Sequence, residues 1–321
     1  MATIFCNARF DDATMARLRE GARGHRLVES RDAIASNLAA AATDEAVRDA
    51  EILFGQPSLE TLRLGERLAW VHLTSAGYAR YAEPDAQAIL AERGIALTTS
   101  STVYAVPCAE QALAAMLLFA RRLDVCLAEQ AEARWSSETH RRASTLLTGS
   151  RVLLLGFGAI GRALAERLVP FAPEIVALRR TPRDDDPVTT IDRDALPHHL
   201  ARADHVVNLL PGGSATHHLL DAARLAEMRP GAFLYNVGRG TTVDQEALLP
   251  LLMSGRLGGA YLDVTDPEPL PADHPLWRAP RCIITPHVAG GRGGEHRALV
   301  EHFLANLDRY ARGEPLRDRV A

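Results

Sequence analysis

The amino-acid sequence predicts an α/β protein with two units, each built on a mostly parallel sheet. Three observations lead to this prediction. Short apolar runs of strand length alternate with longer helix-like stretches along the whole chain, a pattern typical of βαβ units. The chain has 321 residues, which is enough for two domains. A glycine-rich turn separates one strand-like run from the helix-like stretch after it, as in doubly wound sheets.

The N-terminal third carries the shorter of two strand series, so we expect it to form the smaller unit. Strands are expected at residues 3–6, 26–29, 52–54, 70–73 and 95–98, and helices at 13–20 and 44–50. The strand-like runs are rich in β-branched and aromatic residues, and the helix-like runs contain few breakers.

The second series begins at Arg151 and predicts the larger unit. Strands are expected at residues 152–155, 175–178, 206–210, 233–237, 260–264 and 282–285, and helices at 162–168, 221–228 and 244–253. Spacers of this length suit right-handed crossovers between parallel strands. Two long helix-like stretches, 109–133 and 295–311, are expected to join the units, and the proline-rich tract 266–275 is expected to be a loop.

Composition argues against several kinds of partner. The net charge is −4 and the predicted pI is near 6.3, so no global positive field favours nucleic acid or an anionic membrane. The longest apolar run, 112–120, falls short of the roughly 20 residues that span a bilayer. We therefore expect neither a nucleic-acid partner nor a membrane partner.

The cysteines and the N-terminus indicate a cytoplasmic protein. Four cysteines are scattered without a C-x-x-C pair, which predicts free thiols rather than a disulfide or zinc framework. The first ten residues lack the basic and apolar regions of a signal peptide.

All 36 basic residues are arginine, and this restricts the chemistry of any anion site. Without lysine, the chain can have neither a P-loop lysine nor a Schiff-base lysine. Anions must be recognised by arginine, by backbone N–H groups or by helix N-termini.

The glycine-rich turn predicts a dinucleotide site. Its residues follow the expected strand 152–155 and open a helix; they are Gly156, Phe157, Gly158, Ala159, Ile160 and Gly161. In this context the first glycine permits a tight turn, the second lets the backbone approach a pyrophosphate, and the third lets helix and strand pack closely. A glycine-rich turn without a ligand is the alternative.

The residues after the next strand favour NADP over NAD. An NAD enzyme places Asp or Glu about 20 residues after the glycine turn, on the ribose 2′-hydroxyl. This chain instead has Arg179 and Arg180 there, followed by Arg183. Guanidinium groups pair well with a 2′-phosphate. If these arginines only form a solvated loop, NAD remains an alternative.

Three further motifs follow strand ends and supply candidate catalytic residues. Arg239 lies after the strand 233–237, Glu268 after the strand 260–264, and His287 after the strand 282–285. The carboxyl ends of parallel strands meet at one edge, where open α/β sheets bind ligands. Reduction of a keto acid needs a cation for the carboxylate and carbonyl, and a proton donor for the developing alkoxide. Arg239 and His287 are residues of those types, and Glu268 is a suitable partner for the imidazole.

Each of these residues taken alone could be structural or solvated, and the adjacent histidine pairs could suggest a metal. The pairs are His198-His199 and His217-His218. Neighbours in sequence rarely face one ion, and no carboxylate or cysteine stands at ligand spacing. We therefore expect no metal site.

The order of the motifs GFGAIG, NVGRG, DVTDPEP and TPHVAG resembles that of the D-isomer-specific 2-hydroxyacid dehydrogenases, including the glyoxylate/hydroxypyruvate reductases. The resemblance covers nearly the whole chain. It implies two Rossmann-like domains, one flavodoxin-like and one a doubly wound parallel sheet, with the nucleotide domain inserted into the substrate domain. The implied substrate-binding domain is residues 1–101 plus 288–321, and the NAD(P)-binding domain is 102–287. A homodimer is also implied.

The resemblance also implies individual roles for residues of this chain. Arg239 would bind the substrate carboxylate and carbonyl, His287 would be the acid/base and Glu268 its partner. The remaining implied contacts are a carboxylate-binding loop, Ser75, Ala76, Gly77 and Tyr78; residues along the cofactor, Leu210, Pro211, Val237 and Gly238; and Asp263 at the nicotinamide carboxamide. The implied reaction is hydride transfer between NAD(P)H and a small 2-keto acid.

Two departures and two alternatives stay open. Residues 212–217 replace a threonine-rich pattern, and residues 291–294 are unusually rich in glycine, which leaves the pocket shape open. A phosphoglycerate dehydrogenase-like enzyme of the same family is one alternative. A non-catalytic, nicotinamide-dependent corepressor-like binding module is the other, although the chain has no basic patch to support it.

Overall fold

The computed structural model describes residues 1–36 and 39–321, and the chain divides into two compact units. The first unit contains residues 1–104 and 292–321, and the second contains 105–291, so the second is inserted into the first. The sequence placed the two crossings near Thr102 and Val288. The chain crosses between Tyr104 and Ala105 and between Gly291 and Arg292, within a few residues of those positions.

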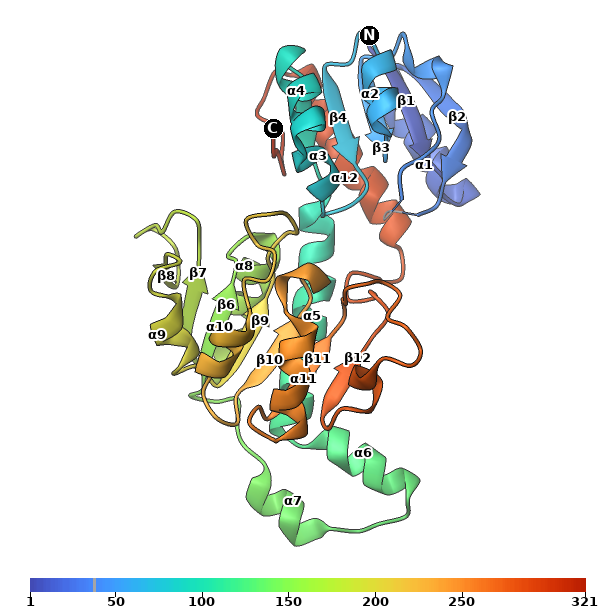
Figure 1. The fold of residues 1–321 in the computed structure, drawn as a ribbon. Coiled ribbons are helices and arrows are strands. Elements are labelled where there is room, and N and C mark those ends of the chain that lie inside the picture. Colours follow the sequence, from blue (N-terminus) through green and yellow to red (C-terminus); the bar gives the residue numbers. More distant parts are fainter. Residues whose placement is uncertain (37–38) are drawn as a thin grey trace. The chain divides into compact units, whose positions relative to one another are not determined.

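The first unit has a five-stranded parallel sheet in the order β2-β1-β3-β4-β5 (Figure 1). This is the flavodoxin-like order that was predicted. The strands are β1 (Thr3–Ala8), β2 (Arg26–Ile34), β3 (Ile52–Gly55), β4 (Trp70–Leu73) and β5 (Ala96–Thr98). The helices are α1 (Asp12–Gly21), α2 (Leu59–Leu64), α3 (Ala79–Ala82), α4 (Pro84–Glu92) and α12 (Glu295–Ala311).

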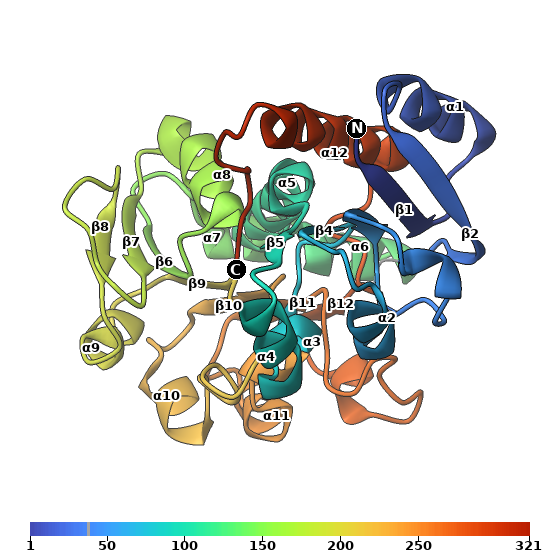
Figure 2. The same ribbon diagram turned by 90° about the horizontal axis from the view of Figure 1, so that it is seen from above.

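Aromatic stacking holds α12 against this sheet. The Phe303 ring lies 4.3 Å from the Phe54 ring, centroid to centroid, and 5.4 Å from the Trp70 ring. Both views show α12 beside α1, where Arg17 and Glu301 form an ion pair at 2.7 Å (Figures 1 and 2). The last helix therefore belongs to the first unit, and its bounds match the predicted stretch 295–311.

The second unit has a seven-stranded parallel sheet in the order β12-β11-β10-β9-β6-β7-β8. The order reverses between β6 and β9, as in doubly wound sheets. The strands are β6 (Arg151–Leu155), β7 (Glu174–Leu178), β8 (Thr189–Ile191), β9 (His205–Asn208), β10 (Phe233–Asn236), β11 (Gly259–Leu262) and β12 (Cys282–Ile284). The strands β6, β9 and β11 are almost wholly buried, which explains why apolar residues follow one another in them and do not alternate with polar ones.

The helices of the second unit connect these strands. They are α6 (Leu123–Ala131), α7 (Ser137–Ala143), α8 (Ala159–Leu168), α9 (Leu196–Leu200), α10 (Ala222–Glu227) and α11 (Gln245–Met253). The helix α5 (Ser101–Ala120) begins in the first unit and continues into the second. Short 3₁₀ turns are η1 (Glu45–Val47) in the first unit, and η2 (Val169–Phe171), η3 (Gly240–Thr242) and η4 (Pro275–Arg278) in the second.

Two helix predictions were wrong. The stretch 109–133 is not one helix, because α5 ends at Ala120 and the chain turns at Arg122, whose φ is +59°, before α6 begins. The stretch 44–50 forms only the turn η1. In both cases helix propensity alone missed a local break.

The helix α5 is longer than the apolar run that was seen in the sequence. By length and composition it could cross a membrane, but half of it is buried inside the protein. Ala109, Ala112, Met116 and Phe119 are among its buried residues. Its apolar character is explained by packing in the core.

The start of α5 is held by the C-terminal segment. The Asp318 carboxylate accepts hydrogen bonds from the Thr102 amide and the Thr102 hydroxyl, both at 2.8 Å. The same segment covers the edge strand β5, where the Leu97 amide donates to the Ala321 carbonyl. The C-terminal segment thus caps the start of α5 and covers the edge strand β5, although it is distant from both in the sequence.

Two buried histidines predict a loss of stability in mild acid. Burial lowers the pKa of His205 from 6.5 to about 4, and burial, with His302, lowers that of His72 well below 6.5. At pH values between the folded and unfolded pKa of these histidines, the unfolded chain binds more protons than the folded chain. The stability that the neutral histidines contribute is therefore fully present above pH 6.5 and decreases as the pH falls below it. At pH 5, His205 alone should cost about 2 kcal/mol of unfolding free energy.

Urea unfolding followed by circular dichroism at pH 7.5 and pH 5 measures this loss. A His205→Gln variant, which keeps an acceptor for the Tyr235 hydroxyl, should have a flatter dependence on pH. Equal unfolding free energies of the unmodified protein at both pH values would contradict the assignment of neutral, buried histidines.

Candidate active site

Strand register brings the predicted motifs of the second unit to one edge of its sheet. Leu155 pairs with Asn208, Asn208 with Asn236, Asn236 with Leu262, and Leu262 with Ile284. The residue after each of these is therefore at the same carboxyl edge: Gly156, Leu209, Val237, Asp263 and Thr285. The glycine turn, the Arg239 motif and the His287 motif follow directly, as the sequence predicted.

The glycine turn has the shape that a dinucleotide requires. Gly156 has a φ of +109°, which favours glycine, and a Cβ at Gly161 would lie 2.7 Å from the Gly156 carbonyl oxygen. A Cβ at Gly158 would meet nothing within 4 Å. The turn, the close packing of helix on strand and the open approach all fit a pyrophosphate at the start of α8. The residues present therefore fit NAD(P).

The loops after β9 and β10 are joined by two asparagines. The Asn208 amide donates to Asn236 Oδ1 at 2.8 Å, and the Asn236 amide donates to the Arg239 carbonyl at 3.0 Å. A Cβ at Gly238 would lie 2.8 Å from the Leu210 carbonyl oxygen, so only glycine fits between these loops. Leu210 and Gly238 are thus neighbours at the sheet edge. Pro211 is exposed and Val237 is buried.

Glu268 and His287 are in direct contact. His287 Nδ1 and Glu268 Oε2 are 2.8 Å apart, and both side chains are partly exposed. Partial burial opposes ionisation of Glu268, but the hydrogen bond and charge of His287, the Thr265 amide and the charge of Arg239 together lower its pKa. Glu268 is therefore a carboxylate at neutral pH, and it holds the imidazole through Nδ1.

Arg239 lies close enough to Glu268 for their charges to interact. Burial lowers the pKa of the Arg239 guanidinium, and the charges of Glu268 and Cys108 act in the opposite direction. Arg239 Nη1 donates to the Gly238 carbonyl at 2.6 Å, which fixes the guanidinium against its own loop. The structure thus brings together the three residues that the sequence proposed as catalytic.

Asp263 fixes the turn that carries His287. Its carboxylate accepts hydrogen bonds from the Thr285 hydroxyl at 2.6 Å and from the Val288 and Ala289 amides, each at 2.9 Å. The His287 amide donates to the Asp263 carbonyl at 2.8 Å. His287 has a φ of +53°, a left-handed conformation that histidine adopts at a cost in energy. The Asp263 contacts offset that cost.

Sequence reasoning missed a hydrogen-bond chain behind Asp263. The Gln111 amide donates to the Tyr261 hydroxyl at 2.8 Å, and that hydroxyl lies 2.6 Å from the Thr285 hydroxyl, which donates to Asp263. Cys108 also lies near, since the charges of Asp263 and Arg239 act on it, but burial raises its pKa to about 12. Gln111 and Cys108 come from α5, and no sequence motif ties that helix to the site.

The predicted loop Ser75, Ala76, Gly77 and Tyr78 lies in the first unit, between β4 and α3. Its shape is fixed by the buried Ser75. The Ser75 hydroxyl donates to the Gly77 carbonyl at 2.7 Å and accepts from the Gln56 amide at 2.9 Å. The loop is therefore a defined turn after a strand.

The arginines after β7 have different environments. Arg180 is exposed, whereas Arg179 is largely buried and pairs with Asp186 at 2.5 Å. The solvated-loop alternative therefore does not fit Arg179, and it stays open for Arg180.

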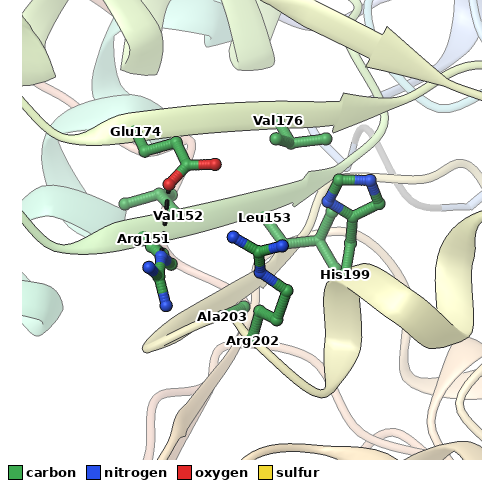
Figure 3. Close-up of a pocket in the computed structure, with 8 residues that line it drawn as sticks. All are labelled: Arg151, Val152, Leu153, Glu174, Val176, His199, Arg202 and Ala203. Atoms are coloured by element: carbon green, nitrogen blue, oxygen red, sulfur yellow. Dashed lines mark hydrogen bonds and ion pairs between the residues drawn. The ribbon is translucent and has the colours of Figure 1, made fainter.

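A small pocket in the second unit lies at the wrong edge of the sheet for this site. It is lined by Arg151 and Glu174, the first residues of β6 and β7, together with His199 and Arg202 (Figure 3). Its volume of about 20 Å³ suits one water. Among residues 1–36 and 39–321, no three His, Cys, Asp or Glu side chains are grouped to hold a metal.

Comparison with known families assigns the second unit. The family model described as D-isomer specific 2-hydroxyacid dehydrogenase, NAD binding domain, matches residues 113–289. Among similar proteins, glyoxylate/hydroxypyruvate reductase B of Pectobacterium carotovorum is 34% identical over 267 residues, covering 81% of each chain. Human glyoxylate reductase/hydroxypyruvate reductase is 32% identical over 228 residues, covering 70% of each chain.

Solved structures of similar proteins carry a nicotinamide cofactor. A D-isomer specific 2-hydroxyacid dehydrogenase from Xanthobacter autotrophicus, in complex with NADPH and MES, aligns with a TM-score of 0.83 at 26% identity. That alignment covers 100% of this chain and 98% of the other. An NADPH-dependent glyoxylate/hydroxypyruvate reductase from Sinorhizobium meliloti, in complex with NADP and malonate, aligns with a TM-score of 0.75 at 26% identity, covering 100% and 97%.

Replacing Asp263 with Asn should loosen the His287 turn. One amide oxygen cannot accept from the Thr285 hydroxyl and both backbone amides, so at least one buried donor loses its partner. We expect the unfolding free energy to fall by about 1–3 kcal/mol and the amides of Val288 and Ala289 to exchange faster. Hydrogen–deuterium exchange with mass spectrometry, beside urea unfolding, measures both. The exposed Asp266→Asn is the matched control, and equal exchange in both variants would contradict the bracing role.

Proposed function

The chain belongs to the D-isomer specific 2-hydroxyacid dehydrogenase family, and we propose that it reduces a small 2-keto acid of the glyoxylate or hydroxypyruvate class to the 2-hydroxy acid. The observation that carries this proposal is the contact between Glu268 and His287, with Arg239 beside them, at the same sheet edge as the glycine turn. The relatives named as reductases support it over the phosphoglycerate dehydrogenase-like and corepressor-like alternatives.

NADP is the proposed cofactor, with NAD as the alternative. The backbone of Gly156 to Gly161 would hold the diphosphate, Arg179 and Arg180 the 2′-phosphate, and Leu210, Pro211, Val237 and Gly238 would line the remainder, with Asp263 at the carboxamide. When bound, the reduced pyridine ring supplies the hydride. The NADP and NADPH complexes of similar proteins support this choice.

His287 and Arg239 divide the work on the substrate. Arg239 would bind the substrate carboxylate and carbonyl, because a guanidinium offers paired donors to both oxygens. His287 would deliver the proton to the developing alkoxide from Nε2, because Nδ1 is held by the Glu268 carboxylate. The contact with Glu268 therefore orients the imidazole and leaves Nε2 for the substrate.

For the first unit we propose a substrate-binding role. Residues 1–101 plus 288–321 would form that domain, and residues 102–287 the NAD(P)-binding domain. The backbone amides of Ser75, Ala76, Gly77 and Tyr78 suit the substrate carboxylate, since that turn is already shaped by Ser75. No nucleic-acid or membrane partner is proposed.

We also propose a cytoplasmic homodimer. The four cysteines are free thiols, which suits a reducing compartment. Large apolar side chains are exposed on α6 and on the segment that follows it, including Leu123, Leu127 and Trp135. A second copy of the chain would cover this surface.

Removing the imidazole should abolish most of the turnover. We expect His287→Ala to lower kcat by ~10²–10⁴-fold, the usual worth of a general acid. His287→Asn should behave alike while tolerating the left-handed φ. Steady-state reduction of glyoxylate and hydroxypyruvate with NADPH, read by absorbance loss, measures this. The exposed His198→Ala is the control, and turnover retained in both variants at position 287 would count against the role.

The cofactor proposal is tested at Arg179. Arg179→Gln removes a charge-assisted partner of a 2′-phosphate, so the affinity for NADPH should fall by ~10–100-fold relative to NADH. Titration of both reduced cofactors by protein fluorescence gives the ratio, with the exposed Arg183→Gln of the same loop as control. An unchanged ratio in Arg179→Gln would contradict the NADP assignment.

A further inference from the structure

An aspartate of the protein already pairs with Arg179, one of the arginines expected to receive a 2′-phosphate, and also with Arg162. Asp186 lies in the loop between β7 and β8, where its Oδ2 contacts Arg179 Nη1 at 2.5 Å and its Oδ1 contacts Arg162 Nη2 at 2.7 Å. The Asp186 side chain is only 2% exposed. One carboxylate thus bridges two arginines that come from different elements.

Both arginines stand beside the glycine turn. Arg179 directly follows β7, and Arg162 lies in α8 immediately after Gly161. The Arg162 guanidinium lies over the ring of Phe157, a residue of the turn itself, 4.8 Å from the ring centroid. Two guanidiniums that converge at the end of the second strand, next to the diphosphate turn, form an anion site of the type that phosphate groups use.

The loop is built to present Asp186 to these arginines. The Arg179 amide donates to the Ile191 carbonyl, and the Arg183 amide donates to the Thr190 hydroxyl at 2.9 Å. Pro187 follows Asp186 and restricts the backbone there. Although burial opposes its ionisation, hydrogen bonds from Arg179 and Arg162 lower the pKa of Asp186. The bridge is therefore an ionic contact at neutral pH.

We propose that Asp186 is a specificity-determining residue that competes with the cofactor 2′-phosphate for Arg179 and Arg162, and thereby weakens NADP(H) binding relative to NAD(H). This inference rests on the proposed use of a nicotinamide cofactor. A phosphate that approaches the two guanidiniums must displace the carboxylate or share the site with a like charge, and either event costs binding energy. NAD(H), which carries a hydroxyl at that position, does not meet this cost. The preference for NADP that Arg179 alone would suggest is therefore stronger than the preference we expect with Asp186 present.

The test is Asp186→Asn, which keeps the size of the side chain and removes its charge. We expect the dissociation constant of NADPH to fall by about tenfold, because the competing anion is gone, and that of NADH to change less than about twofold. Titrations of 2′,5′-ADP and 5′-AMP by calorimetry should separate in the same way, because the 2′-phosphate is their only difference. If the substitution only disturbed the loop, the affinity for all four ligands would fall. A gain in affinity for NADPH and 2′,5′-ADP alone therefore indicates that the competing charge has been removed.

Two comparisons test whether the gain in NADPH affinity comes from loss of the contact between Asp186 and the arginines. Asp185→Asn removes the same charge from the same loop at an exposed position, and it should leave NADPH affinity unchanged. In an Arg179→Gln background, Asp186→Asn should give a much smaller gain, because one of the two contested guanidiniums is absent. An equal gain from Asp185→Asn, or a full gain without Arg179, would overturn the proposal.

The remaining outcomes are also decisive. Unchanged or weaker NADPH binding in Asp186→Asn, while the unmodified protein binds both cofactors, would show that Asp186 is a scaffold for the arginines and would overturn this inference alone. Weaker NADH binding in the variant would make Asp186 the ribose 2′-hydroxyl acceptor and would overturn it too. If the unmodified protein bound no nicotinamide dinucleotide, the proposed function and this inference would fail together.

Discussion

The geometry of the site depends on the Asp263 carboxylate. It accepts from one hydroxyl and two amides, and it joins the end of β11 to the turn after β12. His287 sits in that turn with a left-handed backbone, which a free chain would leave. With the turn held, the imidazole lies 2.8 Å from Glu268, and the proposed proton transfer depends on this contact. The hydrogen bonds of one buried carboxylate therefore determine the geometry of the proposed catalytic pair.

Much of this arrangement could be predicted from the sequence, because parallel strands impose strong constraints. Apolar runs of strand length predicted both sheets, and register then placed the residues after Leu155, Asn236, Leu262 and Ile284 along one edge. The glycine spacing predicted a turn, an open approach and a close contact, and the structure has all three. The glycine spacing is predictive because each of the three glycines is needed for a different steric reason.

The parts that were missed depend on side chains brought together from distant segments. Periodicity could not show the break at Arg122, since the residues on both sides have good helix propensity. Tyr261 and Gln111 are ordinary residues of a strand and a helix until the fold makes them neighbours. Asp186 stands among three consecutive aspartates in a polar loop, and only the structure shows which of them reaches the arginines. That contact qualifies the preference for NADP that the arginines alone suggested.

The most direct test of the account follows a deuterium label that is transferred as deuteride. NADPH deuterated at the transferable position of its reduced ring is incubated with the enzyme and glyoxylate, and the product is examined by mass spectrometry. The account predicts one deuterium at the carbon that bears the new hydroxyl, with transfer at least ~100-fold slower in His287→Asn. A product without deuterium at that carbon, or transfer at the same rate in the variant, would contradict it.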